Sequence, residues 1–170
     1  VLIESDDQFL TLIQGEGTEF HILGMSREEY PELPAVQDQN RFEMPEYLLK
    51  NMINQTLFAI SQNDQTPVLT GCLFDLKDGM IRVVAVDGYR VAVRNEPLQF
   101  SQECSFIVPG KTLGEITKLL SDQQDRNAEV IICDKHIVFS VNGYRVISRL
   151  LQGDYLDYQS AIPQSQTTTI

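Results

Sequence analysis

The sequence predicts an α+β fold: a duplicated β-α-β-β-β unit whose strands form an antiparallel sheet with two helices on one face. The segment Val-Asp-Gly-Tyr-Arg-Val at 86–91 recurs almost unchanged at 141–146 as Val-Asn-Gly-Tyr-Arg-Val. A strand pattern ending in proline precedes each of two amphipathic helix patterns, at Pro45 and Pro109. Three strand patterns follow each helix pattern, so the whole order of elements repeats.

The N-terminal part of the chain carries short strand patterns without a helix. Runs of apolar residues punctuated by glycine indicate strands at 1–4, 9–13 and 18–23. Two prolines in the segment 29–34 then exclude a helix and mark a boundary. A related segment, 153–163, closes the second unit.

These boundaries predict the domain organisation. We expect residues 1–38 to be the C-terminal part of one domain, residues 39–163 to be a complete second domain, and residues 164–170 to begin a linker to a third.

Proline and apolar spacing define the elements of each unit. Proline favours the first turn of a helix, and apolar residues at helical spacing follow both Pro45 and Pro109. The expected elements are strand 41–44, helix 45–63 and strands 68–76, 81–86 and 89–94 in the first unit, then strand 105–108, helix 110–120 and strands 129–133, 138–141 and 144–147 in the second.

Asp-Gly and Asn-Gly between apolar runs are typical of two-residue hairpin turns. Such a turn would pair Val86 with Tyr89 in the first unit and Val141 with Tyr144 in the second. Arg90 and Arg145 then occupy equivalent places, and a framework role is the simplest interpretation of Arg145.

The charge is acidic overall and unevenly distributed. The net charge of −11 taken alone argues against nucleic acid. However, the stretch 47–63 contains no acidic residue and has Lys50 as its only charge, and 108–121 contains two lysines and one glutamate. Chance and helix propensity also explain this pattern, so it acquires meaning only beside other evidence.

Several functional classes find no support in the sequence. Asp75, Asp78 and Asp87 lie near turns, where Asp is common for conformational reasons, and no catalytic motif accompanies them. His21 and His136 have no clustered partners, so no metal or other cofactor is expected. No apolar run is long enough for a membrane helix, and three cysteines without a CxxC motif favour a cytoplasmic protein.

Four stretches together resemble the bacterial sliding clamp family, the beta subunit of DNA polymerase III. Residues 84–92 are similar to the family's Ala-Thr-Asp-Gly-His-Arg-Leu-Ala, and residues 107–111 to its Ile-Val-Pro-Arg-Lys. Residues 148–158 are similar to its Ser-Arg-Leu-Ile-Glu-Gly-Arg-Phe-Pro-Asp-Tyr, and residues 69–71 supply a further short match.

The resemblance implies the DNA clamp fold and a non-catalytic role as a processivity factor. Members of the family have three similar domains, and two subunits close head to tail into a homodimeric ring around duplex DNA. The ring tethers the polymerase, the clamp loader and repair proteins. Since closure uses the first and third domains, this chain alone is not expected to form a ring.

The resemblance also implies a pocket that binds short peptides, typically a Gln followed by Leu and Phe near the peptide's end. The matching positions are Leu69, Val86, Gly88, Tyr89, Arg90, Val91, Leu156, Ser160 and Ala161. Val86, Tyr89 and Leu156 replace the family's Thr, His and Pro, which makes the pocket more apolar or changes its rim. On this reading Arg90 contacts a ligand whereas Arg145 does not.

A DNA-facing helix surface is the second implied site. The expected residues are Lys50, Asn63, Lys111 and Lys118. Gly110 stands where the family has Arg, which weakens the expected contact with phosphates. The alternative is a stand-alone protein-binding module of the same fold that does not encircle DNA.

Overall fold

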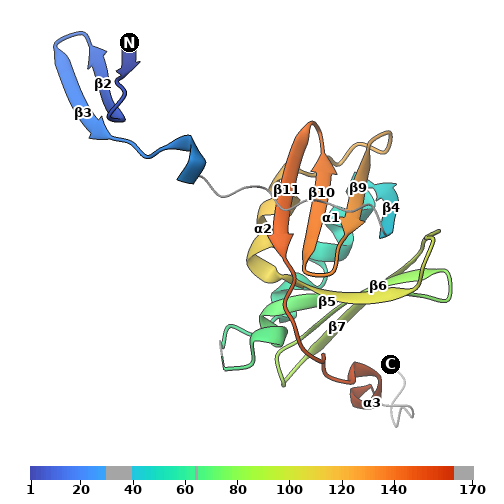
Figure 1. The fold of residues 1–170 in the computed structure, drawn as a ribbon. Helices are drawn as coiled ribbons and strands as arrows, with labels where there is room; N and C mark the ends of the chain where they lie inside the picture. Colours follow the sequence, from blue (N-terminus) through green and yellow to red (C-terminus); the bar gives the residue numbers. More distant parts are fainter. Residues whose placement is uncertain (30–39, 64, 163–170) are drawn as a thin grey trace. The chain divides into compact units, whose positions relative to one another are not determined.

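Two units make up the chain in the computed structural model, Val1–Ala35 and Val36–Ile170. The structure describes residues 1–29, 40–63 and 65–162, coloured along the sequence in Figure 1. The predicted linker at 164–170 and the two prolines at 31 and 34 lie outside the described residues.

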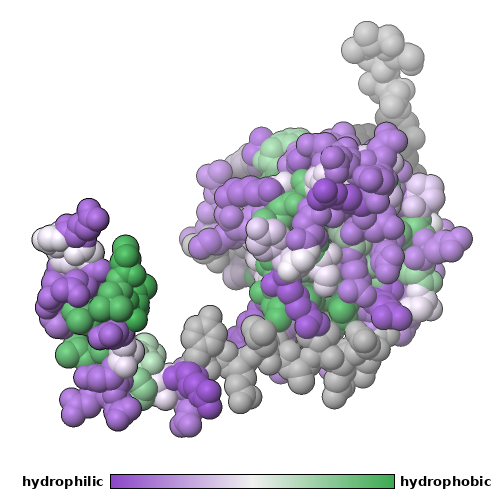
Figure 2. All heavy atoms as spheres, turned by 90° about the horizontal axis from the view of Figure 1, so that it is seen from above, coloured by the Kyte–Doolittle hydropathy of each residue, from purple (hydrophilic) through white to green (hydrophobic). Residues whose placement is uncertain are grey.

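The first unit is a three-stranded antiparallel sheet. Its strands β1 (Leu2–Ser5), β2 (Leu10–Gly15) and β3 (Thr18–Leu23) lie in the order β1-β2-β3, which confirms the three predicted strands within two residues. A short 3₁₀ helix, Arg27–Glu29, follows. Phe20 and Ile22 alternate along β3 and are both exposed, so the unit has apolar side chains on its surface (Figure 2).

The second unit contains the predicted repeat of five elements. The first copy comprises β4 (Asn40–Pro45), α1 (Glu46–Asn54), β5 (Gly71–Lys77), β6 (Met80–Val86) and β7 (Val91–Pro97). The second copy comprises β8 (Cys104–Pro109), α2 (Gly110–Leu119), β9 (Asn127–Ile132), β10 (His136–Val141) and β11 (Tyr144–Arg149). A short helix α3 (Tyr158–Ala161) closes the unit.

The two copies exchange their first strands. β4 of the first copy pairs with β9 of the second, and β8 of the second pairs with β5 of the first. The strands therefore form two four-stranded antiparallel sheets, β11-β10-β9-β4 and β7-β6-β5-β8, where the sequence suggested one. A bridge, Ile107–Leu151, links the edge of β8 to the residues just after β11.

Both helices pack on the same side of the two sheets, as predicted (Figure 1). Leu49, Met52 and Ile53 of α1 and Leu113 and Ile116 of α2 are fully buried. They join one large core with alternate residues of the strands, such as Phe74 of β5, Val83 of β6 and Phe139 of β10. Since strand side chains alternate, the residues between them lie on the opposite face of each sheet.

The starts of the two helices confirm that the units are equivalent. Pro45 precedes α1 with φ −56° and ψ 133°, and Pro109 precedes α2 with φ −55° and ψ 134°. A proline ring fixes φ near these values, and the missing N–H removes no helical hydrogen bond at this position.

Two predicted boundaries in the first copy are wrong. α1 ends at Asn54 because the buried hydroxyl of Thr56 donates to the carbonyl oxygens of Met52 and Ile53, and the chain turns into a 3₁₀ helix at Leu57–Ala59. The strand expected from residue 68 starts only at Gly71, because Pro67 begins another 3₁₀ turn.

Candidate functional site

The two similar hairpins form different turns. In the second, Val141 pairs with Tyr144 as predicted, and Asn142 and Gly143 both have positive φ, 50° and 79°. In the first, Val86 pairs with Val91, so the predicted pair with Tyr89 is wrong and the loop contains four residues, 87–90. The shift of two residues leaves the remaining strand side chains on their predicted faces, whereas Tyr89 and Arg90 move from the strand into the loop.

Side-chain hydrogen bonds account for this difference. In the first hairpin, Oδ1 of Asp87 accepts from the backbone N–H of Tyr89 and of Arg90, both at 3.1 Å. The carboxylate thus closes its own loop as an Asx turn. In the second hairpin, the side chain of Asn142 points away from its turn and donates to the carbonyl oxygen of Leu119.

The loop 87–90 also fixes the side chain of Arg90. Its Nε donates to Oδ2 of Asp87 at 2.8 Å, and its Cζ lies 5.7 Å from the ring centre of Phe58. Phe58 belongs to the 3₁₀ helix after α1 and is exposed, as are Tyr89 and Arg90. Charged and aromatic side chains therefore meet at the end of β6.

An apolar cluster lies on the outer face of the sheet β7-β6-β5-β8, opposite the helices. Val84, Val86 and Tyr158 are its buried members. Three partly buried residues pack against them, namely Leu69, Leu73 and Tyr155. The hydroxyl of Tyr155 lies 3.4 Å from the carbonyl oxygens of Gly71 and Val84, and burial raises the pKa of Tyr155.

A pocket of about 520 Å³ opens beside this cluster. Leu73 and Ile107 line it from the sheet, and the segment 150–159 lines it from the other side. Among the predicted pocket residues, Leu156 lines this space and is half exposed. Ser160 is exposed on α3, where its hydroxyl donates to the carbonyl oxygen of Asp157.

The structure thus brings only some of the predicted pocket residues together. Leu69 and Val86 share the apolar cluster, whereas Gly88, Tyr89 and Arg90 form the loop at its end and Val91 begins β7. Ala161 lies in α3, and its side chain is outside the described part of the chain. Sequence reasoning missed Phe58, Asp87, Tyr155 and Tyr158, although the two tyrosines three residues apart in the segment 155–158 were a usable signal.

The lysines expected to face DNA are mostly paired with acids. Nζ of Lys50 lies 2.8 Å from Oδ2 of Asp122, the residue just after the acid-poor stretch 108–121. Lys118 pairs with Glu115 on its own helix at 2.8 Å. Lys111 is exposed, and within the part of the chain that the structure describes no acid pairs with it. The helix surface therefore carries only a small excess of positive charge.

Two further positions singled out in the sequence lie off the exposed helix surface. Asn63 is exposed, and its Oδ1 accepts from the backbone N–H of Gln65, so the side chain orders its own loop. Gly110 is buried under the side chain of Ile60. A Cβ there would overlap Cδ1 of Ile60 and lie 2.9 Å from the carbonyl oxygen of Thr70. The glycine is thus required by close packing.

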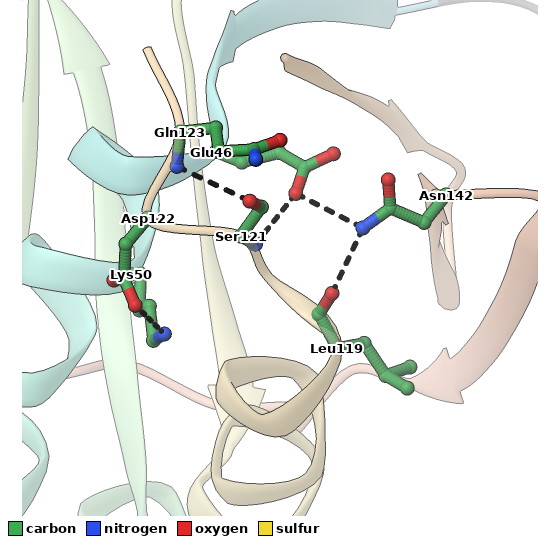
Figure 3. Close-up of polar contacts among 7 residues, drawn as sticks. All are labelled: Glu46, Lys50, Leu119, Ser121, Asp122, Gln123 and Asn142. Carbon is green, nitrogen blue, oxygen red and sulfur yellow. Dashed lines mark hydrogen bonds and ion pairs between the residues drawn. The ribbon is translucent and has the colours of Figure 1, made fainter.

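A buried carboxylate connects the two copies (Figure 3). Glu46 in the first turn of α1 is almost fully buried. Its Oε2 accepts from the backbone N–H of Ser121 at 2.6 Å and from the amide of Asn142 at 3.2 Å. The carboxylate thus joins the start of α1 to the end of α2 and to the β10–β11 turn.

Across residues 1–29, 40–63 and 65–162, no three or more His, Cys, Asp or Glu side chains group in a way that could hold a metal ion. In the same residues, no helix has the length and apolar character needed to cross a membrane.

Comparison with known proteins identifies the family. Residues 43–157 match the family described as "DNA polymerase III beta subunit, central domain". The chain is 36% identical over 172 residues to the beta sliding clamp of Bacillus subtilis and 35% identical over 166 residues to that of Staphylococcus epidermidis. The chain belongs to the DNA polymerase III beta subunit family.

Solved structures agree with this assignment. The DNA polymerase sliding clamp of Bacillus subtilis superimposes with a TM-score of 0.85 at 34% identity, covering 96% of this chain and 43% of that one. A putative DNA polymerase III beta subunit from Eubacterium rectale gives a TM-score of 0.85 at 33% identity, covering 96% and 45%. The match confirms the predicted DNA clamp fold. The chain spans less than half the length of these relatives, 45% of the Bacillus subtilis protein.

Proposed function

We propose that this chain is the central part of a DNA sliding clamp, the non-catalytic processivity subunit of DNA polymerase III in the bacterial cytoplasm. Residues 1–38 end the first domain, residues 39–163 form the second, and residues 164–170 lead to a third. The complete protein closes as a homodimeric ring around duplex DNA, and this chain by itself does not close a ring. Membership of the beta subunit family supports the proposal.

The apolar cluster on the face opposite the helices is the observation that carries the peptide-binding part of this function. A tethering protein needs one surface that lets DNA pass and another that holds its partners. Leu69 and Val86 place apolar surface beside the loop 87–90, where the exposed Arg90 and Tyr89 supply polar groups. An apolar anchor site with a few polar groups at its rim suits a short peptide. Polymerase, clamp loader and repair proteins would bind there.

The helix surface suits loose contact with DNA. Lys50 and Lys118 are paired with acids and Lys111 is exposed, so the phosphates meet little net charge. Weak, non-specific attraction alone would let the protein dissociate from a duplex, whereas a closed ring keeps it on the DNA by topology. The full-length protein should stay on circular DNA and slide off when that DNA is cut once. Dissociation of the protein from both circular and cut DNA, or its retention on both, would contradict a ring that encircles the duplex.

A peptide titration followed by ¹⁵N NMR tests the pocket in this chain. A peptide containing Gln and ending in Leu-Phe should bind in the millimolar range, about −4 kcal/mol, because the wall from the third domain is absent. The chemical-shift changes that the peptide causes in the chain should be concentrated at Leu69, residues 86–91 and residues 156–161. A peptide ending in Ala-Ala is the control and should leave these signals unchanged. Shifts confined to the helices contradict the proposal, and submicromolar binding shows that the missing wall is unimportant.

A further inference from the structure

Arg90 is held at two points although more than half of its side chain is exposed. The Nε–H is engaged by Asp87 at 2.8 Å, and Cζ of the guanidinium lies over the ring of Phe58, 5.7 Å from the ring centre. Arginine side chains on a surface ordinarily sample many rotamers, and fixing one lowers the entropy lost when a ligand binds.

The two oxygens of the Asp87 carboxylate have separate tasks. Oδ1 accepts from the backbone N–H groups of Tyr89 and Arg90 and so shapes the loop. Oδ2 accepts from Nε of Arg90 and so directs the side chain. The carboxylate is itself largely shielded, with 16% of the side chain exposed. Loop shape and side-chain direction are therefore experimentally separable.

Phe58 supplies the second support from a distant part of the sequence. It comes from the 3₁₀ helix after α1, which packs against β6, and 60% of its surface is exposed. A large exposed aromatic ring gains little from burial, whereas its face attracts a cation. With Nε bound to Asp87 and Cζ over the Phe58 ring, Nη1 and Nη2 are the groups of Arg90 left to donate to a ligand. In the described ranges, no residue accepts a hydrogen bond from either nitrogen.

We infer that Asp87 and Phe58 are positioning residues that aim the Nη groups of Arg90 at a carbonyl oxygen of a bound peptide. The inference rests on the proposed peptide-binding function and specifies its polar contact. The Asp87–Arg90 pair is neutral as a whole, so it favours a neutral carbonyl oxygen over a phosphate. The neighbouring cluster of Val86 and Leu69 takes the apolar side chain of the same peptide.

The variant Asp87→Asn separates the two tasks of the carboxylate. The Asn oxygen still accepts from the N–H groups of Tyr89 and Arg90, whereas its NH₂ group cannot accept from Nε of Arg90. In the free chain, the ¹⁵Nε–¹H signal of Arg90 should exchange slowly with water and lose that protection in Asp87→Asn. The backbone amide signals of the loop should stay close to their wild-type positions. An Nε signal that is unchanged by Asp87→Asn overturns the inference without any ligand.

Peptide binding tests the same link functionally. With the Gln-containing peptide that ends in Leu-Phe, Asp87→Asn should raise Kd about threefold to tenfold, and Phe58→Leu should raise it in the same direction. Either effect should vanish when Arg90→Ala is already present, because both residues act through Arg90. Asp78→Asn is the matched control, since Asp78 also pairs with an arginine at a turn of this sheet, Arg82, and should leave Kd unchanged.

The outcomes distinguish the inference from the function on which it rests. Failure of the wild-type chain to bind the peptide contradicts the proposed function, while the Nε signal still reports on the Asp87–Arg90 link. If the wild-type chain binds the peptide normally, but Asp87→Asn weakens binding equally with and without Arg90, the inference is overturned. The proposed function is then unaffected.

Discussion

The carboxylate of Glu46 at the start of α1 accepts a hydrogen bond from the side-chain amide of Asn142 at the tip of the β10–β11 hairpin, 3.2 Å away. The same amide donates to the carbonyl oxygen of Leu119 at the end of α2. One amide therefore serves two acceptors from different elements, which accounts for Asn in the second hairpin where the first has Asp.

Asn142→Asp should destabilise the protein by about 1–3 kcal/mol, because it removes the donor and places a second carboxylate beside Glu46. Chemical denaturation at pH 7 measures the loss. The loss should shrink as the pH falls, because protonation of the new carboxyl group restores a donor toward Glu46. Repulsion from the Glu46 carboxylate places this change above the ordinary Asp pKa of about 3.9. Asp87→Asn is the reciprocal control and should destabilise less. An unchanged unfolding midpoint for Asn142→Asp would show that the Glu46 contacts are unimportant.

Gly110→Arg restores the family's residue and should destabilise this chain by about 1–3 kcal/mol through overpacking. The new Cβ would press on the side chain of Ile60 and on the backbone of Thr70, which yields less readily. Thermal unfolding followed by circular dichroism provides the measurement.

Gly114→Ala on the same helix is the control for Gly110→Arg. A Cβ at 114 meets no atom within 4 Å, and the change should stabilise the protein by about 0.5–1 kcal/mol through helix propensity. Stabilisation by Gly110→Arg would show that Ile60 and its neighbours rearrange freely.

Arg145→Ala should change stability by less than about 0.5 kcal/mol. The framework role predicted from its place in the repeat has no support, because Arg145 is exposed and forms no ion pair with any residue that the structure describes. Arg90→Ala should instead weaken peptide binding. Chemical denaturation of both variants measures the change in stability, and peptide titration measures the change in binding. Unfolding of the Arg145→Ala variant would contradict the small stability change expected here.

Asp87 should titrate below its ordinary pKa. The backbone N–H of Tyr89 has the largest effect in lowering the pKa of Asp87 from 3.8, and the side chain of Arg90 adds to it. A lowered folded-state pKa means that the stabilisation from Asp87 is complete above pH 3.8 and is lost as the pH falls through the lower value. The ¹³C signal of the carboxyl group reports the titration.

Arg90→Ala should move that midpoint only part of the way back, because the larger contribution from Tyr89 remains. Complete return to the ordinary value would assign the effect to Arg90 instead. The loop amide signals of Tyr89 and Arg90 in the wild-type chain should change over the same range of pH.

The sequence predicted what depends on local chemistry. Pro45 and Pro109 fix the backbone conformation at the start of each helix, and their φ and ψ values agree within a degree. The alternation of β6 and β7 placed Val86 and Val91 on the correct face. Their register was wrong by two residues, because it depends on whether the Asp87 side chain bonds within its loop.

Contacts between distant residues limited the prediction of the site. Lys50 is the only charged residue of its acid-poor stretch, yet Asp122 reaches it through the packing of the two helices. The sequence pattern places Phe58 in a continuous helix, and only the turn made by Thr56 brings it to Arg90. Both cases require the tertiary arrangement, which no local pattern contains.

The exchange of β4 and β8 between the two copies makes each copy dependent on the other for folding. Scission in the connection 98–103 would yield two fragments, each missing one outer strand of its own sheet and presenting an open hydrogen-bonding edge. Neither fragment should fold alone, and mixing the two should restore the native structure by complementation.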